Sequence, residues 1–118
     1  MASRGKGANH KGQQFERDIA KKLSVATRYT FKRSLEQRRG GTDAQPDVFN
    51  DHWTQLHIEC KRQKRCNIKA AMRQAINEQA EGGIPIAITK DDREEILVTM
   101  HIKDWMPFLV AWMEEQQK

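Results

Sequence analysis

Three residues, Asp47, Glu59 and Lys61, carry side chains that could together hydrolyse a phosphodiester bond. Asp47 follows a proline at the start of an apolar segment, and Glu59 and Lys61 follow with one residue between them. Alternation along a strand aims Glu59 and Lys61 to one face, and a hairpin would bring Asp47 beside them. Carboxylate oxygens are ligands that Mg²⁺ prefers, and an ammonium can orient a water or stabilise charge on a phosphate. Taken alone, the Glu59–Lys61 spacing equally describes an exposed ion pair on a strand.

The segments that must position these residues follow from the hydrophobic periodicity. Phe15, Ile19 and Leu23 form one apolar stripe of a helix, and the turn signal Asn50-Asp51 between two apolar runs favours a hairpin. The predicted helices span residues 13–26, 68–81 and 103–116, and the predicted strands span residues 29–31, 46–49, 53–61, 84–89 and 95–100. The order α-β-β-β-α-β-β-α predicts one α/β domain, close to α+β, with a central mixed sheet flanked by helices.

Two of these segments carry further expectations. In the strand over residues 53–61, Leu56, Ile58 and Cys60 should share one face, with His57 on the other face beside Glu59 and Lys61. His57 would then line the cleft or, as the alternative that we favour, be half-exposed on the strand. The last helix should pack through the face formed by Trp105, Phe108, Leu109 and Trp112.

The charge is distributed unevenly along the 118 residues, whose net charge is +5. Residues 1–73 hold 17 basic and 7 acidic side chains, whereas residues 74–118 hold 4 basic and 9 acidic ones. This asymmetry favours a polyanionic partner, of which nucleic acid is the commonest in cells, although a solvated basic surface is the alternative. The cations expected to contact DNA are Lys11, Arg33, Arg38, Arg39, Arg62, Lys64, Arg65, Lys69 and Arg73.

Other classes of protein are disfavoured. No stretch approaches the roughly 18 apolar residues of a membrane span, and the N-terminus resembles no signal peptide. We therefore expect a cytoplasmic protein, with residues 1–11 as a flexible basic arm and residues 12–118 as the single domain. His52, His57, Cys60 and Cys66 match no structural zinc spacing. The chain also lacks a Gly-rich phosphate loop and a serine-nucleophile motif.

The motifs and their order resemble the PD-(D/E)XK nuclease superfamily, in particular small phage-type endonucleases and archaeal Holliday junction resolvases. Pro46-Asp47 and Glu59-Cys60-Lys61 match the signature, and Phe15-Glu16-Arg17 resembles the opening helix of small members. The glycine-bearing loop up to Gly40-Gly41-Thr42 and the pair Gln74-Ala75 also fit. The resemblance covers nearly the whole chain, motif by motif, and implies a restriction-endonuclease-like fold.

The resemblance also implies roles for individual residues. Asp47, Glu59 and the backbone carbonyl of Cys60 would hold Mg²⁺, with Mn²⁺ as a substitute, and Lys61 would position the attacking water. Glu16 would complete the metal shell, or alternatively be a carboxylate favoured by the helix dipole near the N-terminus of its helix. Accessory candidates are Ser34 and Gln74, with Gln79 competing for the role of Gln74. The products would carry a 5′-phosphate and a 3′-hydroxyl.

These observations predict a metal-dependent DNA endonuclease that hydrolyses phosphodiester bonds, with Holliday junction resolution as one structure-selective form. The alternative is a non-catalytic nucleic-acid-binding module, which explains the charge asymmetry but gives Asp47 and Glu59 no functional role. The sequence leaves duplex, branched DNA and RNA open as substrates. Because symmetric substrates favour dimeric enzymes, a homodimer is also considered, with Trp112 on its interface.

Overall fold

The computed structural model describes residues 2–35 and 45–118, and in residues 2–9 it describes the backbone only. Arg38 and Arg39, both expected to contact DNA, lie outside these ranges. The elements are α1 (Ala2–Thr27), β1 (Lys32–Arg33), β2 (Val48–Phe49), β3 (Leu56–Gln63), α2 (Ile68–Glu78), β4 (Ile84–Asp91), β5 (Leu97–Met100) and α3 (Ile102–Gln116). Their order confirms the predicted α-β-β-β-α-β-β-α succession.

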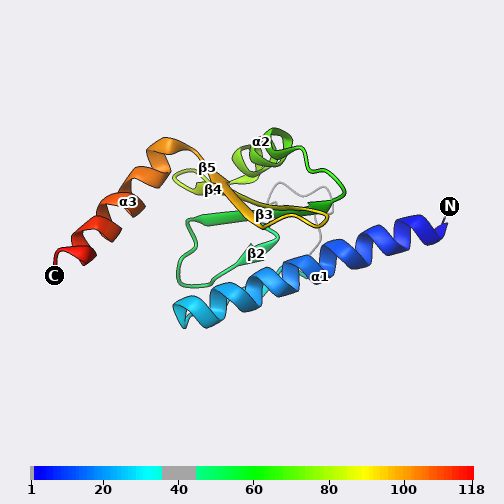
Figure 1. Ribbon diagram of the computed structural model, residues 1–118, viewed down its shortest axis with the longest axis horizontal. Coiled ribbons are helices and arrows are strands. Elements are labelled where there is room, and N and C mark those ends of the chain that lie inside the picture. Colours follow the sequence, from blue (N-terminus) through cyan, green and yellow to red (C-terminus); the bar gives the residue numbers. More distant parts are fainter. Residues whose placement is uncertain (1, 36–44) are drawn as a thin grey trace.

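The five strands form one mixed sheet in the order β1-β2-β3-β4-β5. Strands β1, β2 and β3 pair antiparallel, and Val48 faces Ile58 in the predicted hairpin between β2 and β3. Strands β3 and β4 run parallel over their full length, joined by the crossover helix α2, and β5 returns antiparallel beside β4. Helices α1 and α2 lie on opposite faces of this sheet (Figure 1).

The hydrophobic core is divided between the two faces of the sheet. Phe15 and Ile19 of α1 pack with Ile58 and Cys60 on one face. On the other face, Ala71 and Met72 of α2 pack with Ala87 of β4, which is the register partner of Glu59. Glu59 therefore points toward α2 and Cys60 toward α1, as the predicted alternation requires.

The first helix is longer than predicted. It begins at Ala2 and not at the predicted residue 13, so the backbone of residues 2–12 is helical. These residues contain no proline, and extending a formed helix avoids the cost of nucleation, against about 1 kcal/mol of opposition from each of Gly5 and Gly7.

The first strand lies later in the chain than predicted. Residues 29–31 were expected to be strand, but β1 consists of Lys32–Arg33. Arg28 adopts a left-handed φ of 66° just after α1, and the Phe31 N–H donates to Ser24 Oγ of α1 at 2.8 Å. The helix end thus holds this segment as a turn.

The largest departure concerns α3. Its predicted packing face is wrong for the described part of the chain, because no residue of α3 is buried and Trp105, Phe108 and Trp112 are exposed. The helix runs away from the sheet, and the two termini lie at opposite ends of the long axis (Figure 1). In the described ranges, no helix has the length and apolar character needed to cross a membrane.

Candidate active site

Asp47 lies at the junction of β1, β2 and β3, just before β2 begins. Its backbone N–H donates to Ile58 O, and its carbonyl accepts from the Ser34 N–H, both at 2.9 Å. Its carboxylate Oδ2 accepts the backbone N–H of Cys60 at 2.8 Å. The hairpin therefore places a carboxylate against the residue that separates Glu59 from Lys61.

Glu59 is fully buried on the α2 face, with 0% of its surface exposed. Its Oε1 forms a 3.0 Å hydrogen bond with His57 Nε2, and His57 itself is 5% exposed. Glu78 Oε2 of α2 lies 4.0 Å from the same imidazole nitrogen. A buried carboxylate requires polar partners of this kind, because burial without them costs several kcal/mol.

Lys61 and Cys60 complete the strand segment. Lys61 is the register partner of Thr89 and is half-buried on the same face as Glu59. Cys60 is buried on the opposite face, toward α1. The backbone N–H of Cys60 is bonded to Asp47, and its carbonyl is the predicted metal ligand.

Glu16 lies on the α1 side of the sheet and forms an ion pair with Arg33. Arg33 Nε donates to Glu16 Oε1 at 2.7 Å, and both side chains are largely buried. Because α1 begins at Ala2, Glu16 is in the middle of the helix, so the alternative that the N-terminal dipole favours it does not hold. Arg33, expected on DNA, is here engaged with a carboxylate.

The electrostatic environment of Cys60 shows which acidic groups act on this position. Burial raises the pKa of the Cys60 thiol far above its usual range, and the carboxylates of Asp47, Glu16 and Glu59 raise it further, against a smaller lowering by Lys61. Carboxylates on both faces of the sheet thus act on this thiol, Glu59 from the α2 face and Glu16 from the α1 face. Carboxylate and backbone carbonyl oxygens, such as that of Cys60, are the ligands that a divalent cation such as Mg²⁺ prefers.

Both accessory candidates lie next to these groups. Ser34 is buried beside Asp47, to which its backbone N–H is bonded. Gln74 Nε2 donates to Glu78 Oε1 at 3.3 Å, so it contacts the group that faces His57. Gln79, the competing candidate, is the C-cap residue directly after α2.

A cavity of about 470 Å³ opens beside His57 and Glu78. Pro46, the residue before Asp47, lines it together with Gln55 and the turn after α2 at residues 79–83. His57 thus lines a cavity, and our preferred expectation that it would be half-exposed is wrong.

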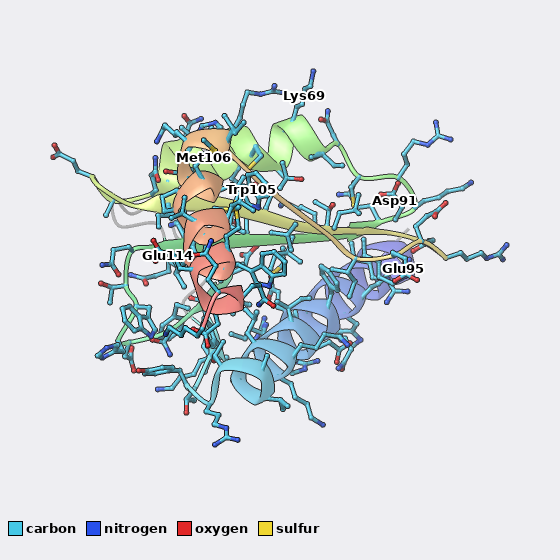
Figure 2. The ribbon with its side chains drawn as sticks, turned by 60° about the vertical axis from the view of Figure 1, so that its left-hand side comes forward. Lys69, Asp91, Glu95, Trp105, Met106 and Glu114 are labelled. Atoms are coloured by element: carbon cyan, nitrogen blue, oxygen red, sulfur yellow. The ribbon has the colours of Figure 1, made fainter. Side chains whose placement is uncertain are left out.

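The cations expected to contact DNA fall into two groups. Lys11 and Arg62 lie 2.6 and 3.8 Å from Asp92, so both are near a carboxylate, as is Arg33. The other described cations are exposed on the turn after β3 and on α2, and they are Lys64, Arg65, Lys69 and Arg73. Figure 2 shows Lys69 on the outer side of α2, pointing away from the sheet.

The structure gives no support to a zinc site built from His52, His57, Cys60 and Cys66. Cys60 faces α1 whereas His57 faces α2, and the His52 ring stacks at 5.3 Å from the Tyr29 ring. Among the described residues, the one group of metal-ligating side chains within 4.8 Å of one another is His57, Glu59 and Glu78.

Sequence reasoning missed Glu78 and undervalued His57. Glu78 is an acidic residue at the end of an amphipathic helix, a pattern common on solvated surfaces. The available signal for His57 was its position two residues before Glu59 on the same strand face. Only the packing of α2 over β3 brings Glu78 to this histidine.

A mixed five-stranded sheet between helices, with the carboxylate of Asp47 bonded to the backbone of β3 beside Glu59, defines a restriction-endonuclease-like α/β protein. A family model described as "Phage putative PDDEXK endonuclease" matches residues 7–117. The chain belongs to this family. Comparison with curated proteins and with solved structures found no match.

Proposed function

We propose that this protein is a DNA endonuclease that hydrolyses phosphodiester bonds with a bound divalent cation, Mg²⁺ or its substitute Mn²⁺. One observation carries the proposal: the Asp47 carboxylate binds the Cys60 N–H at 2.8 Å, at the residue between Glu59 and Lys61. A surface ion pair on a strand would not account for this contact or for the complete burial of Glu59.

The proposed roles follow from the chemistry of each group. Asp47, Glu59 and the Cys60 carbonyl hold the cation, and Glu16 extends the acidic set from the α1 side. When bound, the cation supplies Lewis acidity and lowers the pKa of a coordinated water. The ammonium of Lys61 orients the attacking water and stabilises negative charge that develops on the phosphate. His57 holds the carboxylate of Glu59 in place through their hydrogen bond.

DNA is the proposed substrate because an acidic centre needs flanking cations to attract a polyanion. Lys64, Arg65, Lys69 and Arg73 are exposed close to the end of β3 and on α2. Contacts of this kind bind the phosphate backbone and carry little sequence information. We therefore propose cleavage that depends on DNA structure more than on sequence, with a four-way junction among the candidate substrates.

The test is a cleavage assay with Mg²⁺ or Mn²⁺ on labelled linear duplex, single strand, four-way junction and RNA duplex. Glu59→Gln and Lys61→Ala should each abolish cleavage, and binding measured without divalent cation should persist in both. Lys118→Ala is the matched control, because it removes an exposed lysine at the chain end and should cleave as wild type.

Each outcome separates one candidate from the others. Symmetric nicks confined to the junction would identify a resolvase, and cutting of every DNA duplex would identify a general endonuclease. A protein that binds DNA but does not cleave it with either Mg²⁺ or Mn²⁺ would instead support the non-catalytic nucleic-acid-binding module. Cleavage that survives in Lys61→Ala would contradict the proposed site.

A further inference from the structure

Helix α3 presents an apolar surface that the described part of the chain leaves uncovered. Ile102 is 72% exposed and Trp112 62% exposed, and neighbouring β5 adds exposed Val98. The further exposed apolar side chains of α3 are Trp105, Met106, Phe108, Val110 and Met113. A 15-residue helix without packing is marginal in water, and soluble monomers rarely expose apolar patches of this extent.

The residues of α3 are segregated by type around the helix axis. At 100° per residue, the apolar side chains occupy an arc of about 200° centred on Leu109. The opposite arc holds Ala111 and the charged residues Lys103, Asp104, Glu114 and Glu115. Figure 2 labels Trp105 and Met106 near the start of α3 and Glu114 near its end. This segregation is the pattern of a helix that packs against another surface.

Two hollows flank the helix, and the larger one is mostly apolar. A cavity of about 530 Å³ is lined by Phe108 together with Tyr29, Phe31 and Trp53 near the C-terminal end of α1. A second hollow of about 300 Å³ lies between β5 and the start of α3, beside Trp105. Each is large enough to accept a bulky side chain from outside.

We propose that α3 is the dimer interface, and that α3 of a second copy packs against it antiparallel. A second copy is the occupant that symmetry favours, because a two-fold axis sets each apolar arc against an identical apolar arc. Lys103 and Glu114 lie outside this arc, and Lys103 pairs with Asp104 of its own helix at 3.2 Å, so these charges stay in solvent. The two-fold axis then passes near Leu109, the centre of the apolar arc.

The available area is sufficient for a stable dimer. The exposed parts of the seven apolar side chains on α3 and of Val98 amount to on the order of 900 Å², against roughly 800 Å² that each partner contributes to a standard interface. The proposal goes beyond the nuclease function and does not depend on it, because its test measures only the molecular mass of the protein in solution.

The first experiment measures the mass of the full chain by light scattering after size-exclusion chromatography. We expect twice 13.7 kDa for the wild type and 13.7 kDa for Leu109→Asp at the same concentration. Ala111→Asp is the matched control, because it places the same charge on the opposite arc of the same helix and should remain dimeric. Circular dichroism checks that all three proteins are folded.

The second experiment tests the antiparallel arrangement by disulfide cross-linking in a Cys66→Ser background. Leu109→Cys, at the two-fold axis, should form an intermolecular disulfide under mild oxidation, whereas Ile102→Cys, seven residues from the axis, should not. A wild type that stays at 13.7 kDa at tens of micromolar would overturn the proposal, and a different partner would then have to cover α3. Cross-linking through Ile102→Cys as efficient as that through Leu109→Cys would overturn the antiparallel pairing.

Discussion

His57 and Glu59, two residues apart on β3, form a 3.0 Å hydrogen bond inside the layer between the sheet and α2. Both side chains are buried, and Glu78 approaches the same imidazole from α2. The carboxylate that the signature motif requires is thus held by a neighbour on its own strand. This contact ties the stability of the fold to the geometry of the proposed active site.

Replacing His57 should therefore destabilise the protein. His57→Ala leaves a buried carboxylate without its imidazole partner, and we expect a loss of about 2 kcal/mol in the free energy of unfolding. Urea denaturation followed by circular dichroism measures it. His101→Ala, an exposed histidine whose side chain makes no cap hydrogen bond, should stay within about 0.5 kcal/mol of wild type. Equal effects of the two substitutions would contradict the structural role of His57.

The Glu16–Arg33 pair should behave as a coupled unit. A double-mutant cycle with Glu16→Gln and Arg33→Gln should give a coupling energy of about 1–2 kcal/mol, because the two largely buried groups are 2.7 Å apart. Calorimetric titration of the same variants with Mn²⁺ then separates the proposed roles. A weaker affinity in Glu16→Gln supports metal ligation by Glu16, whereas an unchanged affinity limits it to holding Arg33.

The thiol of Cys60 should be unreactive in the folded protein. Its pKa is raised by burial first and then by the carboxylates of Asp47, Glu16 and Glu59, so the thiolate fraction at pH 8 is lower than in an ordinary cysteine. In a Cys66→Ser background, Ellman's reagent should react roughly a hundredfold more slowly with the native protein than with the protein in urea. A native thiol that reacts at the rate of the unfolded one would show that Cys60 is accessible.

The exposed cations of α2 should contribute to DNA affinity through phosphate contacts. The slope of log affinity against log salt is negative, and Lys69→Gln and Arg73→Gln should each reduce its magnitude by about 0.9 if each cation neutralises one phosphate. Fluorescence anisotropy with labelled duplex in EDTA, at several salt concentrations, measures the slope. Lys118→Gln should leave it unchanged, and an unchanged slope in the α2 variants would remove this face from the DNA path.

The local pattern of the sequence was sufficient for the succession of elements and for the face of β3 on which each residue lies. Alternation over residues 53–61 correctly separated Glu59 from Cys60, because strand geometry is a property of neighbouring residues alone. The proline before Asp47 and the turn at Asn50-Asp51 indicated the hairpin that sets Val48 opposite Ile58. Residues within about fifteen positions of one another were therefore enough to predict this strand and its hairpin.

Contacts between distant segments were decided by the tertiary structure. Glu78 meets His57, and Glu16 meets Arg33, because α2 and α1 pack over the sheet in one particular register. The periodicity of residues along a helix does not determine how the helix is positioned on the sheet. The same holds for α3: its periodicity correctly marked an apolar face, but periodicity does not say whether that face packs against its own chain. Which surface buries it depends on the position of the helix relative to the sheet, and here the helix points away from its own chain.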